Sequence, residues 1–175
     1  MYIKHDDSRR YTVGVLVDNE PGVLSRVSGL FSRRGFNIES LTVGTTLDPK
    51  VSRITIVVKG TDAHIEQLVQ QLYKLICVQK VQVMQPRNSV ERQLLLVKVR
   101  ADVTEREGLM RLVDIFKAKV LDVTRSSMTL QITGENDKIA SMLSLLEDYG
   151  ILELVRTGVV ALERGDGVMS SDIFD

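Results

Sequence analysis

Residues 11–31 read YTVGVLVDNEPGVLSRVSGLF and change within one stretch from strand spacing to helix spacing. Apolar side chains alternate along residues 11–17, as in a strand with one buried face. From Val23 to Phe31 they recur at the three- and four-residue spacing of an amphipathic helix. The intervening residues 18–22, DNEPG, form a turn whose proline suits the first helical turn. The stretch therefore predicts a strand that leads directly into a helix.

The rest of the first half continues this pattern. Strands are expected at residues 36–46, 51–58 and 77–85. A second helix is expected to open with Thr61 or Asp62 as its N-cap and to turn these apolar residues inward: Ile65, Leu68, Val69, Leu72 and Ile76. The order strand, helix, strand, strand, helix, strand is typical of a ferredoxin-like βαββαβ unit.

The second half repeats this order. Strands are expected at 94–101, 119–124, 127–133 and 151–162, the last one bent near Gly158. One helix is expected to start at a capping box formed by Thr104 and Glu107, and another at Asn136 or Asp137. The helical stripes align at a constant offset, which pairs Leu24, Val27, Leu30 and Phe31 with Leu109, Leu112, Ile115 and Phe116. The predicted fold class is α+β, with two ferredoxin-like βαββαβ units.

The expected domain boundaries follow from turn-forming and strand-breaking residues in the sequence. Residues 1–10 are expected to be a flexible arm, 11–85 the first domain, 86–91 a linker, 92–164 the second domain and 165–175 a mobile tail. Units of this size bury only about 60% of their unfolded surface, so we expect further burial through dimer formation or docking of the units.

Composition excludes several classes of protein. Lys and Arg together number 23, as do Asp and Glu, so the chain lacks the positive surplus of a general nucleic-acid binder. A single cysteine excludes an intrachain disulfide and a cysteine-based zinc site. No apolar run is long enough for a membrane span, and the first residues lack a signal-peptide core. No catalytic or metal-binding constellation is expected, and a cytoplasmic location is predicted.

The turn at residues 18–24 is the candidate binding site. A helix start leaves backbone N–H groups unpaired and carries partial positive charge, which stabilises a carboxylate. Gly22 lacks the Cβ that would block a ligand, and the Asn19 amide offers both a donor and an acceptor. These are the groups that an amino acid requires at its two charged ends. The alternative reading is structural, because proline and glycine also make a good helix start.

Two stretches around this turn carry a family resemblance: residues 18–26, DNEPGVLSR, and 29–41, GLFSRRGFNIESL. They resemble the ACT domain of the regulatory (small) subunits of acetolactate synthase. The likeness continues at residues 95–99, 122–124 and 157–165. It implies a subunit without catalytic activity that binds a large catalytic subunit, which uses thiamine diphosphate, magnesium and FAD to condense two 2-keto acids. It also implies activation of that partner and feedback inhibition by a branched-chain amino acid, usually valine.

The resemblance implies a homodimer in which ACT domains pair side by side. One protomer would supply Asn19, Pro21, Gly22, Val23 and Leu24 to the effector, and the other would supply Asn37 and Ile38. The second domain would serve dimer stability and partner contacts. A free-standing ACT-type amino-acid sensor is the alternative. An RNA-binding ferredoxin-like domain is a further class, but it requires exposed aromatics where these strands offer Val, Thr and Ile.

Overall fold

The computed structural model describes residues 8–169. The elements over this range follow one another in this order: β1 (Arg9–Asp18), α1 (Val23–Arg33), β2 (Ile38–Thr45), β3 (Val51–Gly60), α2 (Asp62–Leu72), β4 (Val78–Met84), the 3-10 turn η1 (Pro86–Asn88), β5 (Ser89–Arg100), α3 (Arg106–Phe116), β6 (Lys119–Val123), β7 (Ser127–Gly134), α4 (Asn136–Glu147), β8 (Ile151–Arg156) and β9 (Val160–Glu163).

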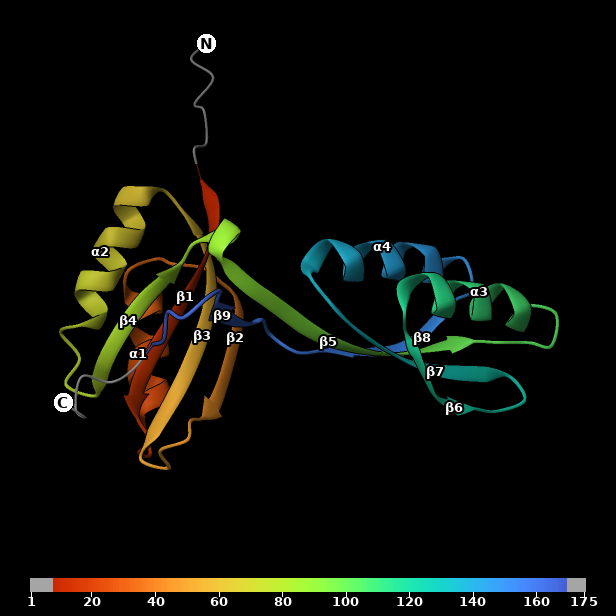
Figure 1. The fold of residues 1–175 in the computed structure, drawn as a ribbon, viewed down its shortest axis with the longest axis horizontal. Coiled ribbons are helices and arrows are strands. Elements are labelled where there is room, and N and C mark those ends of the chain that lie inside the picture. Colours follow the sequence, from red (N-terminus) through yellow and green to blue (C-terminus); the bar gives the residue numbers. More distant parts are fainter. Residues whose placement is uncertain (1–7, 170–175) are drawn as a thin grey trace, which may run out of the picture. The chain divides into compact units, whose positions relative to one another are not determined.

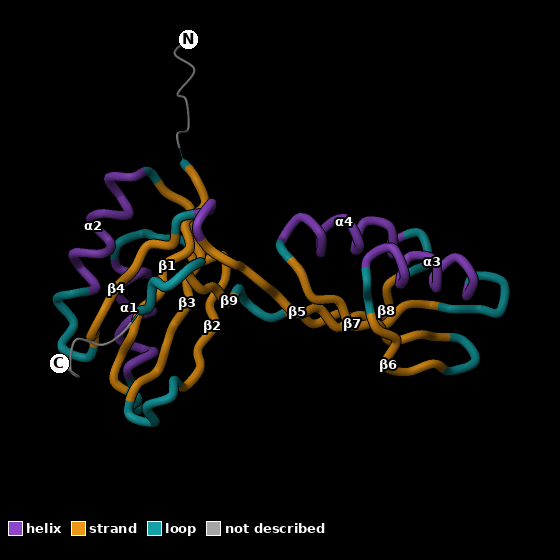
Figure 2. The backbone as a smooth tube through the Cα atoms, viewed as in Figure 1, coloured by secondary structure: helices purple, strands orange, loops and turns teal. Residues whose placement is uncertain are grey.

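The chain forms two compact units. The first unit takes in the residues up to 90 and those from 159 onward, and the second unit takes in residues 91–158. In the first unit an antiparallel sheet has the strand order β2-β3-β1-β4, and α1 and α2 lie on one of its faces (Figures 1 and 2). Val13, Val15 and Val17 of β1 point toward these helices and are buried in the core.

The second unit repeats this architecture. Its antiparallel sheet has the order β6-β7-β5-β8, and α3 and α4 cover one face (Figure 1). Leu95, Val97 and Val99 of β5 form the core with residues such as Leu109 and Ile139 from the helices. The α+β prediction with two ferredoxin-like units is confirmed, because alternation of apolar residues along β1 and β5 buries one sheet face under two helices in each unit.

The boundaries of the two units along the chain differ from those that the sequence indicated. Residues 86–91 were expected as a linker, but η1 occupies 86–88 and β5 runs without a break from Ser89 to Arg100. The expected strand 151–162 is wrong, because β8 ends at Arg156 and β9 is a separate strand that pairs with β5. The second domain was expected to reach residue 164, whereas the second unit ends at residue 158.

We call residues 159–169 the C-terminal strap. Its Val159 is only 1% exposed and packs with Ala161 against Val57 and Met84, on the sheet face opposite α1 and α2. Of the expected tail, residues 165–169 belong to this strap, and residues 170–175 lie outside the described range. Of the expected arm, residues 1–7 lie outside that range as well, and β1 already begins at Arg9.

Two expectations for α2 have different outcomes. Thr61 is confirmed as the N-cap, because its side-chain oxygen accepts a hydrogen bond from the backbone N–H of His64. Ile76 is wrong as a core residue, since α2 ends at Leu72 and the Ile76 side chain is 99% exposed. A stripe extrapolated past the end of a helix no longer predicts burial.

The two caps expected in the second unit are wrong. The Thr104–Glu107 capping box does not form, because α3 begins at Arg106 with Glu105 as its N-cap, and the Glu105 carboxylate accepts from the backbone N–H of Asp102 instead. Helix α4 has Glu135 as its N-cap, and residues 136–137 already lie inside the helix.

The repeat register is also shifted by one residue. Leu24, expected to match the buried Leu109, is 45% exposed. The buried residues Val23 and Val27 of α1 correspond instead to Leu109 and Val113 of α3. Similar apolar residues at neighbouring positions made the wrong register look equally good in the sequence.

Candidate functional site

The loop between β1 and α1 is fixed to the turn between β2 and β3. The Asn19 backbone N–H donates to the Lys50 carbonyl at 2.7 Å. The Asn19 side-chain N–H donates to the Pro49 carbonyl at 2.8 Å, and the Ser52 hydroxyl donates to the Asn19 amide oxygen at 3.0 Å. Each end of the Asn19 amide therefore has one partner among residues 8–169, which leaves one N–H and one lone pair without a partner in that range.

Gly22 opens α1 in a conformation that side chains disfavour. It is the N-cap residue with φ 86° and ψ −9°, in the left-handed region. No side chain in the described part of the chain caps this helix start, and its first turn contains no acidic residue. The first helical hydrogen bond runs from the Arg26 N–H to the Gly22 carbonyl, so the amides of Leu24 and Ser25 precede the helical ladder. The helix start is thus open to an anion.

Space is available at this helix start. A Cβ built on Gly22 would meet no atom within 4 Å. Asn19, Pro21 and Leu24 are exposed, whereas Val23 is buried in the core. Val23 therefore holds the helix in place, and the surface offered to a ligand consists of the loop backbone, the Asn19 amide and the Leu24 side chain.

Asn37 and Ile38 lie at the other end of α1. Asn37 is exposed in the connection after α1, and Ile38 is the first residue of β2 and half-buried. Helix α1 has 11 residues, and a helix of this length spans about 16 Å. The structure therefore brings Asn19, Pro21, Gly22, Val23 and Leu24 together, but does not bring Asn37 and Ile38 to them within one chain.

The loop lies beside the far end of β2. Ser52, which donates to Asn19, pairs with Thr45 at the end of β2, whereas Ile38 at its start pairs with Val58. Strand β2 is at the edge of the sheet. The two groups of candidate residues thus mark opposite ends of one edge strand.

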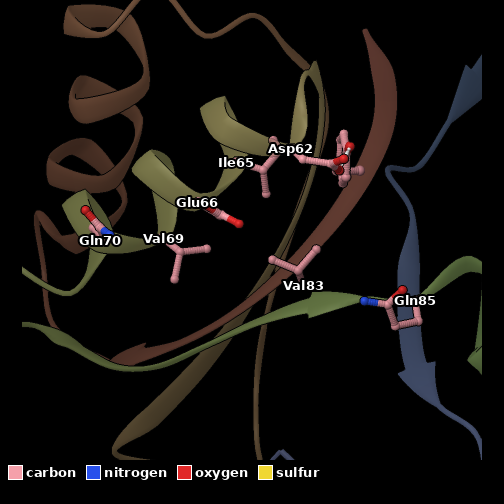
Figure 3. A pocket seen from close by; sticks show the side chains of 8 residues that line it. Asp62, Ile65, Glu66, Val69, Gln70, Val83 and Gln85 are labelled. Carbon is pink, nitrogen blue, oxygen red and sulfur yellow. Dashed lines mark hydrogen bonds between the residues drawn. The ribbon is translucent and has the colours of Figure 1, made fainter. Parts of the chain in front are cut away.

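A cavity of about 470 Å³ lies elsewhere in the first unit, between α2 and the strands β1 and β4 (Figure 3). None of the candidate residues lines it. Figure 3 shows Asp62, Glu66 and Gln70 of α2 facing this cavity. At its rim the Tyr11 hydroxyl donates to the Asp62 carboxylate, and this hydrogen bond raises the pKa of Tyr11 above its ordinary value.

Groups typical of catalytic or metal sites are few in the described range. Cys77 is buried in the core of the first unit, and His64 is exposed with its ring edge-on to Phe36. No group of three or more metal-ligating side chains occurs among residues 8–169. Within the same range, no helix has the length and apolarity that crossing a membrane requires.

Sequence reasoning missed the contacts of the strap with the sheet. The Arg53 guanidinium donates to the Ala161 carbonyl at 2.8 Å, and burial lowers the pKa of Arg53. The Val159 N–H donates to the Ser40 hydroxyl at 2.9 Å. Residues 53 and 161 are too far apart in the chain for any local pattern to connect them.

Two family models match this chain. The model described as "AHAS small subunit-like ACT domain" matches residues 13–80, and the model described as "Small subunit of acetolactate synthase" matches residues 92–165. The two matches lie on either side of the start of β5.

Known proteins resemble the chain over almost its whole length. A probable acetolactate synthase small subunit of Archaeoglobus fulgidus is 50% identical over 157 residues, which cover 90% of this chain and 98% of that protein. The acetolactate synthase small subunit of Mycolicibacterium smegmatis is 50% identical over 155 residues, covering 89% and 91%. The crystal structure of the Thermotoga maritima small subunit superimposes with a TM-score of 0.86 at 43% identity, covering 91% of this chain and 99% of that one. The chain therefore belongs to the family of acetolactate synthase small subunits, which are regulatory and non-catalytic, and its N-terminal unit is an ACT domain.

Proposed function

We propose that this small subunit activates the large catalytic subunit of acetolactate synthase and makes it sensitive to inhibition by a branched-chain amino acid. Valine is the expected effector. The effector binds where two ACT domains pair in a homodimer. Thiamine diphosphate, magnesium and FAD belong to the catalytic subunit, and both subunits act in the cytoplasm. The proposal rests on one observation: the candidate residues occupy opposite ends of an edge strand.

That placement supports a two-fold arrangement. Antiparallel pairing of β2 with β2 of a second copy would extend the sheet through backbone hydrogen bonds that an edge strand leaves free. The end of β2 in one copy would then lie beside the start of β2 in the other. Because Asn19 is bound next to the end of β2, its loop would meet Ile38 and Asn37 of the second copy. A site divided within one chain becomes complete in the dimer.

The chemistry of the two halves suits a small zwitterion. The open amides at the start of α1 would receive the effector carboxylate, because the first turn of this helix has no acidic residue and no described side chain caps it. The free lone pair of the Asn19 amide, together with Asn37, would accept from the ammonium group. Leu24 and Ile38 would provide apolar surface for the branched side chain.

Regulation then follows from differential binding to two states of the dimer. Effector that binds one arrangement more tightly than the other shifts the population toward it, and coupling of about 1–3 kcal/mol changes affinity or activity by a factor of about 5 to 150. By reciprocity, the catalytic subunit changes effector affinity by the same factor.

The second unit is assigned to dimer stability and to contacts with the partner subunit. Its edge strand β8 carries apolar side chains in solvent, with Leu152 at 49%, Leu154 at 47% and Val155 at 62% exposure. An apolar edge strand is a surface that proteins usually cover. Coverage by another subunit would remove these apolar side chains from solvent.

The decisive variant is Gly22→Asp. It adds a carboxylate where the effector carboxylate is proposed to bind, and we expect loss of valine inhibition in the reconstituted holoenzyme while activation of the large subunit persists. The open space around Gly22 accommodates the side chain, and the left-handed backbone costs about 1–2 kcal/mol. Inhibition assays and calorimetric titration with valine measure the effect.

Gly150→Asp is the matched control. Gly150 has φ 85° and follows α4 in the second unit, so the variant carries similar backbone strain without a charge at α1. It should keep its valine response. Normal valine inhibition in Gly22→Asp would contradict the site, and binding of valine without any association with a large subunit would favour a free-standing sensor.

A further inference from the structure

Hydrogen bonds anchor the strap to three strands of the first sheet. The Val159 N–H donates to the Ser40 hydroxyl of β2, the Arg53 guanidinium of β3 donates to the Ala161 carbonyl, and the Gln82 amide of β4 donates to the Glu163 carboxylate at 2.7 Å. These contacts, with Val159 and Ala161 buried, fix the strap on the face opposite the helices. The strap therefore follows any movement of the sheet beneath it.

The residues just before the strap are anchored in the second unit. The Thr157 N–H donates to the Leu94 carbonyl at 2.9 Å, and the Leu94 N–H donates to the Thr157 hydroxyl at 3.0 Å. Only Gly158 separates Thr157 from Val159 along the chain. Since consecutive Cα atoms are about 3.8 Å apart, this connection has little slack.

Ser40 lies close to the proposed effector contacts. It is two residues after Ile38 on the same strand, and its pairing partner in β3 is Val57, on which the strap packs. A displacement of the backbone at Ile38 is therefore only two residues from Ser40, whose hydroxyl binds the strap.

We propose that Ser40 is a positioning residue that transmits effector binding at β2 to the second unit through the strap. This inference rests on the proposed function, since it requires an effector at Asn37 and Ile38. Movement of β2 displaces Ser40, the hydrogen bond carries Val159 along, and the short connection through Gly158 passes the displacement to Thr157 and β5. Ser40 itself need not touch the effector.

The test separates coupling from binding. In Ser40→Ala the N–H of the buried Val159 loses its partner, which favours release or rearrangement of the strap. Calorimetry would give the valine dissociation constant of the small subunit alone and in complex with the large subunit. The ratio of these constants is the coupling. We expect affinity of the free subunit to stay within about twofold, and the ratio to fall by about 2- to 30-fold.

Two further variants control the result. Ser40→Thr keeps the hydroxyl and should restore the ratio. Thr42→Val is matched to Ser40→Ala, because Thr42 lies on the same strand two residues further on, and its buried hydroxyl has no hydrogen-bond partner within residues 8–169. It should leave the ratio unchanged.

The outcomes distinguish the two proposals. An unchanged ratio in Ser40→Ala, an equal loss in Thr42→Val, or failure of Ser40→Thr to restore coupling would each overturn the role of Ser40 while leaving the effector site intact. Absence of valine binding or inhibition in the unaltered holoenzyme would overturn the proposed function, and the role of Ser40 with it.

Discussion

The two units share an architecture but differ at the start of their first helix. Helix α1 follows a left-handed Gly22 and has no acidic residue in its first turn. Helix α3 follows Glu105 in a right-handed conformation and carries Glu107 in its first turn. Carboxylates of the chain therefore already lie at the start of α3, where they repel an anionic ligand and stabilise the helix dipole. The same fold thus has a first helical turn without acidic residues in one unit and one with a carboxylate in the other.

The outer faces of the two sheets also differ. In the first unit the strap lies on this face, and Thr12, Leu16 and Thr55, which point toward it, are buried. In the second unit the corresponding face of β5 includes exposed Lys98 and Arg100. The two units repeat the apolar pattern on the sheet face that packs against the helices. This repeat does not predict whether the opposite sheet face is covered.

The largest effect that would test the comparison concerns one phenylalanine from the first helix of each unit. Phe31 is fully buried, whereas Phe116 is only partly buried. We expect Phe31→Ala to lower the free energy of unfolding by about 3–5 kcal/mol, and Phe116→Ala by about 1–2 kcal/mol because less apolar area is lost. Urea denaturation of each variant measures this. Equal losses would mean that the two cores are equivalent.

A smaller effect is expected from removal of the strap. A chain ending at Gly158 exposes Val57 and Met84 and loses the burial of Val159, worth about 1.5–3 kcal/mol. Amide hydrogen exchange should accelerate in β1 to β4 by at least about tenfold and stay unchanged in β6 and β7.

A chain ending at Met169 keeps every described strap contact and serves as the control for this truncation. Uniform acceleration in both units, or none in the first, would contradict a strap that protects mainly the first unit.

The smallest effect distinguishes a real cap from an apparent one. Thr61→Ala removes the hydrogen bond to the His64 N–H and should cost about 0.5–2 kcal/mol. Thr104→Ala removes an exposed residue that caps no helix, and its cost should stay within about 0.5 kcal/mol. Thermal melts of both variants measure these losses of stability. A larger loss for Thr104→Ala would show that Thr104 does cap α3.

The sequence predicted the features that depend on neighbouring residues. Alternation along residues 11–17 and helical spacing from Val23 to Phe31 identified β1 and α1, because burial of one face imposes a period on the chain. The glycine at position 22 identified the open helix start for the same local reason. Caps were less predictable, since Thr61 and Thr104 have similar sequence surroundings but different helix starts.

Only the tertiary structure decided what lies on the other side of the first sheet. Nothing near Ser40 or Arg53 in the chain indicates that Val159 and Ala161 return to them across more than a hundred residues. It also decided that Asn37 lies at the far end of α1 from Gly22, so that the two groups of candidate residues do not meet within one chain. The physical reason is that periodicity reports which face of an element is buried, whereas the identity of the covering segment depends on packing between residues that are distant in the chain.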